Sequence, residues 1–512
     1  MVHNYDQFVR ANETMSKVAL FRCEIERYPD EAPFHPPEAF PELAHAGIHE
    51  INPGNGGYRA VRDTLALLGL DQQNFGTPEW NPLGAYVRRG DKVVIKPNFV
   101  LHEFGAQKGA NCLTTHGSVL RAVLDYVYLA TGQDGRIVIA DAPLQGADFE
   151  RVVSKAGLRE VQEFYHEKLG CTIEAIDLRQ VRAVIDEESS FIQKVECLRG
   201  DPRGYCEIDL GQSSRLSELK GHDSRYVVGD YDTAVTNQRH KSPRHSYVVS
   251  KTILEADAVI CVPKLKTHSK AGVTVCLKNV VGIIGSKDCL PHHRHGKTNH
   301  GGDEFPADYP TRWLLSARIY AIMQGRVPTA AWRLMRRFAG AYLGAGTPMN
   351  GNGSRSTFFP SGGWYGNDTI WRTVDDLNRI LFFYDLRKCR VQSQPCRRYF
   401  AIVDGIVGME GNGPLRGTPK PAGVILGGDD PLVMDVVAAM LMGFDWQRIR
   451  MLRGITDSKE GARYSGFAGD ESAIELLSNA PEWKSLATLK RRHLNFEAAT
   501  GWRKFLEMQD VG

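Results

Sequence analysis

The stretch DKVVIKPNFV, residues 91–100, decides the fold, because a short apolar run ends abruptly in Lys96-Pro97-Asn98. Residues 116–129 then show the apolar spacing of an amphipathic helix, and GRIVIADAP, residues 135–143, has the pattern of a second buried strand. A strand–helix–strand alternation is typical of βαβ units. We therefore predict an α/β fold with a mainly parallel sheet, flanking helices and insertions, in one body or in two α/β lobes.

The same alternation continues on both sides of this stretch. Strands are predicted at residues 17–23, 254–263, 398–405 and 422–428. Helices are predicted near residues 57–68 and at 148–156, 272–284, 371–383 and 431–441. The segment KLKTH (Lys264–His268) is interpreted as the junction between the strand before it and the helical stretch after it.

The predicted elements divide the chain into six segments. A chain of 512 residues exceeds the usual size of one hydrophobic core, so either two domains or one heavily decorated domain is expected. The segments are 1–90 (N-terminal strand, Pro-rich loop and helix joining the core), 91–180 (first α/β half), 181–250 (irregular insertion), 251–300 (Lys/His motif segment), 301–365 (basic amphipathic insertion) and 366–512 (second α/β half and C-terminal helices).

Composition excludes several classes of protein. A net charge of +3 is nearly neutral for this length and gives no reason to expect nucleic acid as a partner. The start lacks the apolar region of a secretory signal, and no stretch has enough apolar residues to span a bilayer, so we expect a cytoplasmic protein. The ten cysteines are scattered without a C-x-x-C pair, which argues against a disulfide scaffold, a zinc ribbon and a cysteine-ligated iron–sulfur cluster.

One stretch departs from the balanced charge. Residues 311–355 contain no Asp or Glu, but arginines recur among apolar residues from Arg312 to Arg337. A basic amphipathic helix of this kind can make a peripheral contact with an anionic membrane. The alternative, which we favour, is a helix with one buried face and one solvated arginine face.

Polar side chains follow four of the predicted strands. The strand ends are Lys96–Asn98, Asp141, Lys264–His268 and Asp404. In open α/β sheets, ligands bind outside the carboxyl ends of the strands. The sequence therefore predicts that Lys96, Asp141, Lys264, His268 and Asp404 converge in one site.

Lysines gather most densely at the third strand end. Lys264, Lys266, His268, Lys270 and Lys278 lie within fifteen residues, with no acidic residue among them. Such lysines repel one another unless an anion neutralises them, so a carboxylate or phosphate is the expected ligand. Alternation along the chain puts Lys264 and Lys266 on the same face, and we assign both to the anionic ligand. Lys270 instead fits a solvated loop. Neighbouring lysines would keep His268 neutral and able to act as a base; the alternative is a hydrogen-bonded structural histidine.

Three further segments contain residues of possible structural or functional importance. His292, His293 and His295, with His300 and Asp303, are candidate ligands of a divalent metal ion, but their spacing matches no known metal motif and a merely polar loop is the favoured reading. The glycine-rich run 404–414 is neither G-x-G-x-x-G nor a P-loop, so no nucleotide cofactor is inferred. Asp430 before Pro431 is typical of a helix N-cap.

These segments together resemble the domain of unknown function 362 family. The resemblance covers the KPN strand, the helix entry at 114–127, ADAP, the run PKLKTHSKAGVTVCLKNVVGIIG (263–285), VDGIVGMEGNGP (403–414) and GGDDPLVMDVVAAMLMG (427–443), and extends from Val18 to Gly443. It implies an α/β enzyme without an established general reaction. Some relatives carry a ferredoxin-like cysteine segment and are labelled iron–sulfur proteins, but this chain has none. The residues carried over are Lys96, Asn98, Asp141, Lys264, Lys266, His268, Lys278, Asn279, Asp404, Glu410, Pro414, Asp430 and Asp435, and the segment Gly363–Thr369 is expected to complete the pocket.

The sequence thus favours an enzyme that binds an anionic small molecule and moves a proton or a group. The catalytic candidates are His268, Asp141, Asp404 and Glu410. The substrate-binding candidates are Lys96, Asn98, Lys264, Lys266, Lys278, Asn279, Gly413 and Asp435. Hydride transfer is disfavoured, because no dinucleotide motif is present. The alternatives are a non-enzymatic binding or iron–sulfur-associated accessory protein, and a metal-dependent enzyme that uses the His292–His300 loop with Asp303.

Overall fold

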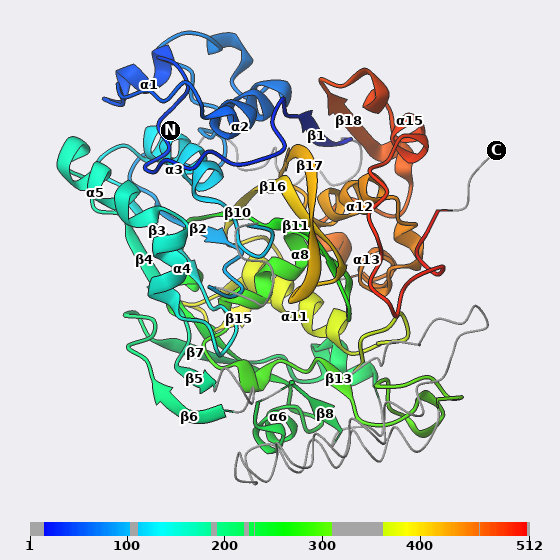
Figure 1. The fold of residues 1–512 in the computed structure, drawn as a ribbon. Helices are drawn as coiled ribbons and strands as arrows, with labels where there is room; N and C mark the ends of the chain where they lie inside the picture. The colour runs from blue at the N-terminus through cyan, green and yellow to red at the C-terminus, as the bar shows by residue number, and fades with distance from the viewer. Residues whose placement is uncertain are drawn as a thin grey trace.

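A ten-stranded sheet runs through the centre of the molecule (Figure 1). The computed structural model describes residues 15–102, 111–185, 192–219, 225–229, 231–309, 362–459 and 461–508. The strand order is β18 (Ile474–Ser478), β1 (Ser16–Arg22), β17 (Arg416–Gly428), β16 (Arg398–Asn412), β10 (Ala258–Val262), β2 (Lys92–Pro97), β3 (Arg136–Asp141) and β4 (Glu174–Asp177). Two further strands, β11 (Lys264–His268) and β12 (Gly272–Thr274), extend from β16.

Most pairings in this sheet are parallel. The strands β16, β10, β2, β3 and β4 form a continuous parallel run, and β11 joins β16 in the same direction. Only β17, which is antiparallel to both of its neighbours, and the short hairpin of β11 and β12 depart from this pattern. The predicted α/β fold with a mainly parallel sheet is confirmed.

Helices cover both faces of the sheet (Figure 1), as the alternating burial of its strands requires. Val93 and Ile95 of β2 pack into one hydrophobic cluster, while Val94 between them packs into the other. The first cluster includes α2 (Gly56–Leu67), α3 (Gly117–Thr131), α4 (Phe149–Lys155) and α5 (Leu158–Leu169), with α1 (Pro41–His45) at its edge. The second includes α7 (Lys251–Leu254), α8 (Cys276–Asn279), α11 (Ile370–Phe383), α12 (Pro431–Met442), α13 (Arg450–Thr456), α14 (Gly461–Tyr464) and α15 (Leu486–Arg491).

Small antiparallel sheets lie outside the central one. They pair β5 (Val181–Ile185) with β6 (Ile192–Cys197), β7 (Tyr205–Asp209) with β9 (Ser246–Ser250), β8 (Tyr226–Val227) with β13 (His293–Arg294), and β14 (Tyr384–Asp385) with β15 (Arg390–Val391). Several belong to the predicted insertion at 181–250, which also holds α6 (Thr233–Arg239). That segment therefore has more regular structure than its composition indicated. The division of the chain into six segments stays a prediction.

The lysine-rich segment differs from its prediction. Residues 264–268 form β11, a strand held between β16 and β12, and not a junction. The predicted helix at 272–284 begins instead with β12, and only Cys276–Asn279 is α-helical before a 3-10 turn at Val280–Ile283. The reason is the tight turn at Gly272, whose φ of +84° suits glycine and folds β12 back onto β11.

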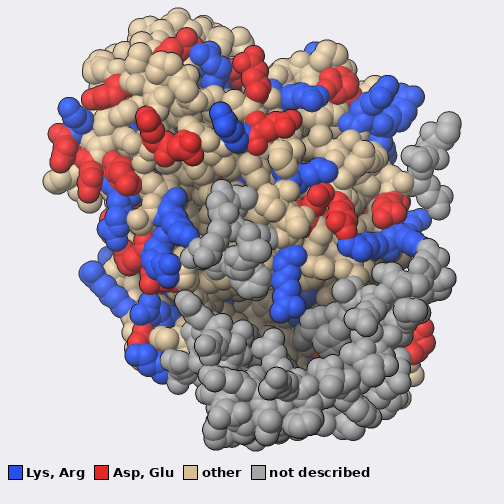
Figure 2. All heavy atoms as spheres, in the orientation of Figure 1, with Lys and Arg blue, Asp and Glu red and all other residues tan. Residues whose placement is uncertain are grey.

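Charged side chains of both signs are interspersed on the face of the molecule shown in Figure 2, as the near-neutral net charge implies. Among the described residues, no helix combines the length and apolar character needed to cross a bilayer. The predicted arginine-rich helix falls within residues 310–361, outside the described part of the chain.

Helix α12 is tied to α8 by a buried aspartate side chain. Asp430 caps α12 by accepting hydrogen bonds from Leu432 N and Val433 N at 3.0 and 3.1 Å, so the predicted N-cap is confirmed. One turn further, Asp435 accepts Cys276 N at 2.7 Å and Leu277 N at 3.3 Å, and burial raises the pKa of its carboxyl to about 8. These are donors of the first turn of α8, which have no partner within that helix. Asp435 therefore fixes the start of α8, the helix that carries Lys278 and Asn279.

Replacement of Asp435 by alanine should destabilise the protein strongly. Two buried N–H groups would lose their acceptor, and each unpaired donor costs about 1–3 kcal/mol. Chemical denaturation measures the free energy of unfolding. Asp470→Ala is the control, because Asp470 caps Ser472 N at the surface. A loss for Asp435→Ala no larger than that of the control would contradict this role.

Candidate functional site

A buried ion pair joins the ends of two neighbouring parallel strands. Lys96 Nζ of β2 lies 2.7 Å from Asp141 Oδ1 of β3, and both side chains are almost fully buried. Lys96 also donates to Asn279 Oδ1 at 3.2 Å and to the Pro97 carbonyl at 2.8 Å, while Asp141 Oδ2 accepts Phe99 N at 2.6 Å. The ammonium thus has three acceptors and both carboxylate oxygens have donors. This pair holds the strand ends together.

A glycine allows the next segment to pack against this pair. A Cβ atom on Gly282 would overlap both Asp141 Oδ1 and Lys96 Nζ, and the Gly282 carbonyl accepts Ala142 N at 2.8 Å. The 3-10 turn after α8 can approach the strand ends this closely because residue 282 has no side chain.

A second buried pair joins the start of β11 to the middle of β16, which continues past the predicted strand end at Asp404 to Asn412. Lys264 Nζ is 3.0 Å from Asp404 Oδ2, and neither side chain has measurable exposure. Tyr28 donates its hydroxyl to Asp404 and accepts Lys264 Nζ, and His116 N donates to Asp404 Oδ2 at 2.9 Å. The Tyr28 and His116 rings stack at 4.0 Å. Lys264 is therefore neutralised inside the protein, unlike the ligand-facing lysine that the sequence predicted.

Lys266 has a different environment from Lys264. Its Nζ donates to Asn98 Oδ1 and, at 3.0 Å, to the Leu113 carbonyl, and it makes no ion pair within the described residues. Burial, followed by the neighbouring charge of Lys264, lowers the pKa of Lys266 to about 7. Lys264 and Lys266 were predicted to share one face, but they meet the cost of burial differently. An aspartate neutralises Lys264, whereas the pKa of Lys266 is lowered.

Two more buried lysines lack a carboxylate partner in the described part of the chain. Burial, then the charge of Lys270, lowers the pKa of Lys278 to about 8. Burial lowers the pKa of Lys287 to about 7, and its Nζ donates only to the Val281 carbonyl, at 3.2 Å. The charge of Lys278 lowers the pKa of both Lys266 and Lys287, so Lys278 lies near each of them. We call Lys266, Lys278 and Lys287 the lysine cluster.

The lysine cluster adjoins the first ion pair through two asparagines. Asn98 Oδ1 accepts Lys266, Asn98 Nδ2 donates to Asn279 Oδ1 at 3.5 Å, and Asn279 Nδ2 donates to the Lys96 carbonyl at 3.0 Å. Lys96, Asn98, Lys266 and Asn279 are thus one connected network. Lys287 was missed by sequence reasoning, since it lies just beyond the recognised run 263–285.

His268 lies beside the lysine cluster. Its Nδ1 accepts two backbone hydrogen bonds, from Lys270 N at 3.0 Å and Ala271 N at 3.1 Å. Burial, followed by the charge of Lys278, lowers its pKa well below the usual value, so the ring is neutral. In a neutral imidazole whose Nδ1 is an acceptor, Nε2 carries the proton. His268 thus presents a hydrogen-bond donor and not the base that the sequence suggested.

Within the described residues, the remaining candidates make no hydrogen bond to the amines of the lysine cluster. Glu410 pairs with Lys420 at 3.4 Å and accepts Glu497 N at 3.0 Å. The Gly413 carbonyl accepts Ser269 N at 2.9 Å, and a Cβ there would overlap the Thr267 carbonyl. With Asp435 serving as a cap, these three positions support the scaffold of the site.

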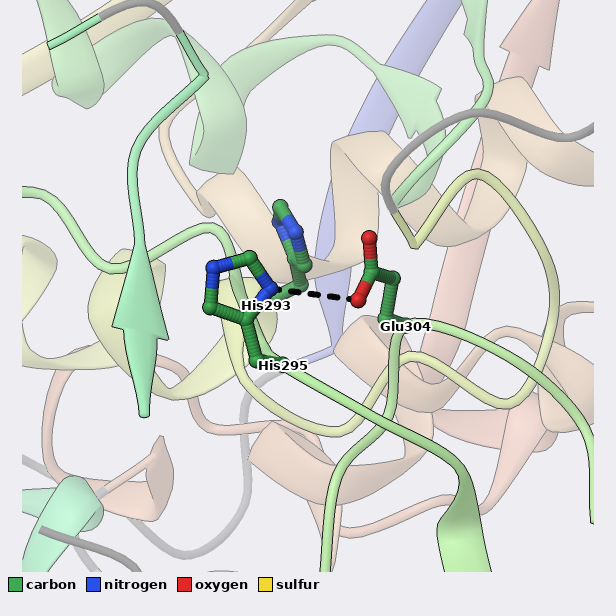
Figure 3. Close-up of side chains that lie close together, drawn as sticks. All are labelled: His293, His295 and Glu304. Carbon is green, nitrogen blue, oxygen red and sulfur yellow. Dashed lines mark hydrogen bonds and ion pairs between the residues drawn. The ribbon is translucent and has the colours of Figure 1, made fainter. Parts of the chain in front are cut away.

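The loop at residues 292–304, which we call the histidine loop, brings together a different set of residues from the one predicted. His293, His295 and Glu304 offer ligand atoms that all lie within 4.8 Å of one another (Figure 3). His292 Nδ1 instead bonds the Leu290 carbonyl at 2.6 Å, and the exposed His300 lies outside the cluster.

Asp303 supports this loop and does not belong to the cluster. It accepts Arg294 N, Asp368 N at 2.9 Å and the Thr369 hydroxyl at 2.6 Å. Trp364 Nε1 donates to the Asp303 carbonyl at 3.0 Å. The Gly363–Thr369 segment thus braces the histidine loop.

Comparison with known proteins places the chain in a family. The family model described as domain of unknown function (DUF362) matches residues 93–199 and 211–440. No curated protein matches. The crystal structure of a Thermotoga maritima protein from a structural genomics consortium is similar at 12% sequence identity and a TM-score of 0.32, over 74% of this chain and 57% of that chain. This chain therefore spans less than two thirds of the solved protein. Because the family model matches more than half of its residues, the chain belongs to the domain of unknown function 362 family.

Proposed function

We propose that this protein is an enzyme that binds a small molecule with a carboxylate or phosphate group at the lysine cluster. The observation that carries the proposal is the burial of Lys266, Lys278 and Lys287 without a carboxylate partner among the described residues. Lys266 lies in β11, the strand that follows the carboxyl end of β10, and this edge of an open α/β sheet is the usual place for a ligand.

The contrast with the paired lysines supports an external anion. Burying an ammonium group is costly unless an opposite charge accompanies it. Lys96 and Lys264 each have an aspartate within 3.0 Å. The amines of the lysine cluster have no such partner among the described residues, and burial lowers their pKa instead. They are therefore partly neutral near pH 7. An anion that enters would restore their charge and gain charge-assisted hydrogen bonds.

Donors in and around the cluster suit such an anion. Within the described residues, the Lys278 ammonium makes no hydrogen bond, although the residue is buried. His268 adds a neutral Nε2–H, because its Nδ1 is occupied by backbone donors. An ammonium and an imidazole N–H can bind two oxygens of one carboxylate or phosphate group.

Lys266 is the group best suited to move a proton. In its neutral form the amine has two N–H donors, which match Asn98 Oδ1 and the Leu113 carbonyl, and a lone pair that remains available. A pKa of about 7 is the value that favours general base catalysis at neutral pH. This arrangement fits abstraction of a proton near the bound acid group, or group transfer assisted by a base.

Lys278→Met should weaken anion binding without loss of stability. Loss of one charge-assisted hydrogen bond costs on the order of 1.5–3 kcal/mol, or roughly 10–100-fold in affinity. Titration calorimetry with inorganic phosphate at pH 7 measures this affinity, and thermal unfolding without phosphate should show an equal or higher midpoint. Lys92→Met is the matched control, because Lys92 is exposed at the opposite end of β2.

Phosphate binding that is equal in the Lys278→Met variant and the control would refute the proposed anion site. A separate experiment tests whether the site holds a metabolite. Mass spectrometry of small molecules extracted from wild-type protein should reveal an acidic metabolite that is depleted in the Lys278→Met protein.

Lys264→Met should behave in the opposite way. It leaves the buried Asp404 carboxylate without its partner, and breaking a buried pair costs about 3–5 kcal/mol. Chemical denaturation of the two methionine variants side by side measures the difference. If Lys264→Met is as stable as Lys278→Met, the division into paired and unpaired lysines is wrong.

Anion binding should weaken as pH rises from about 7 to 9, because the lysine cluster loses its charge over this range. Sulfate is the probe, since its own charge stays constant. The lowered pKa values mean that the folded protein binds fewer protons than the unfolded chain between about 7 and 10, so the contribution of these lysines to stability without ligand rises with pH. Calorimetry measures the sulfate affinity, and denaturation without sulfate measures the free energy of unfolding, both as a function of pH. In each case the difference between wild type and Lys278→Met gives the contribution of Lys278, which should fall with pH for binding and rise with pH for stability. A difference independent of pH would contradict the assignment.

A further inference from the structure

Two histidines and a glutamate of the histidine loop point toward one another. His293 lies in β13 and His295 follows two residues later, so the two side chains fall on the same side of the extended backbone. Glu304 comes from the returning arm of the loop, and its Oε2 lies 3.2 Å from His295 Nδ1 (Figure 3). His293 is fully buried, while the His295 side chain is 38% exposed.

Contacts within the histidine loop hold the backbone that carries these three side chains in place. The Arg294 carbonyl accepts Asp303 N and Glu304 N, both at 3.1 Å. Gly302 lies so close to the carbonyls of His295 and Gly296 that a Cβ atom would overlap them. Asp303, anchored to Thr369, completes the bracing. The loop is therefore preorganised around the cluster, which lowers the cost of ligand binding.

Two imidazoles and a carboxylate are the ligand set of open, three-residue transition-metal sites. Bonds of about 2.1 Å in tetrahedral geometry place ligand atoms about 3.4 Å apart. The His295–Glu304 separation of 3.2 Å already fits, and the ligand atom of His293 lies within 4.8 Å of both.

We infer that His293, His295 and Glu304 bind one divalent transition-metal ion of the zinc type, with a fourth position open to water or an anion. The inference does not rest on the proposed function, since it uses none of the residues of the lysine cluster. The two sites are nevertheless neighbours, because Lys270 Nζ lies 3.4 Å from His293 Nδ1 and its charge also acts on Lys278.

Lys270 gives the inference a second, opposite consequence. An ammonium next to a ligand repels a bound cation. Lys270→Met should therefore tighten metal binding, whereas loss of a ligand should weaken it. A gain in affinity is a result that a misfolded variant cannot produce.

The test is a titration of chelator-treated, full-length protein with Co²⁺, followed by visible absorption, and with Zn²⁺ in competition, both without phosphate. Wild-type protein should bind one ion per chain. His295→Ala and Glu304→Gln should lower the affinity by more than the roughly 10–100-fold that loss of an outer-shell partner costs. His300→Ala, an exposed histidine of the same loop, is the matched control and should bind as wild type. Circular dichroism checks that each variant is folded.

Absence of Co²⁺ binding by folded wild-type protein would overturn the inference. Equal binding by His295→Ala and His300→Ala would overturn it as well, as would weaker binding by Lys270→Met. This titration contains no phosphate, so a negative result would not count against the anion site. In the same way, the effect of Lys278→Met on phosphate binding does not bear on the metal site.

Discussion

The need to neutralise buried ammonium groups governs the centre of this structure. Five lysines, Lys96, Lys264, Lys266, Lys278 and Lys287, are buried around the strand ends. Two of them are paired with aspartates of neighbouring strands, at 2.7 and 3.0 Å. These pairs connect β2 with β3 and β11 with β16, so the charges that could destabilise the core instead hold neighbouring strands together.

The two ion pairs and the residues around them determine where the lysine cluster lies. Lys266 follows Lys264 by two residues on the same strand, and Asn98 and Asn279 connect it to Lys96. Gly282 allows the turn after α8 to approach the first pair, and Asp435 fixes the start of α8. The scaffold thus brings together, at a fixed place, three amines that no carboxylate of the described residues neutralises. A cluster of this kind is costly for stability alone, which is why we assign it a ligand.

The sequence allowed the sheet to be predicted because its central strands contain short apolar runs that alternate along the chain with helical patterns. It also singled out both members of each ion pair, but not the pairing, since spacing along the chain does not tell which aspartate faces which lysine. The segment 264–268 was misassigned because a strand rich in lysine has no apolar pattern, and its burial depends on partners from β16 and β12. Tyr28 and Glu304 lie in irregular segments and were missed; only the folded chain brings Tyr28 to Asp404 and Glu304 to His295.

The most direct measurement of the central claim is a crystal structure of the protein with selenate, located by anomalous scattering from selenium. If the lysine cluster is an anion site, one strong anomalous peak should lie within hydrogen-bond distance of the Lys278 and Lys266 amines, on the side of His268. A map with no peak there, and with the Lys278 ammonium bonded to a carboxylate of the chain itself, would contradict it.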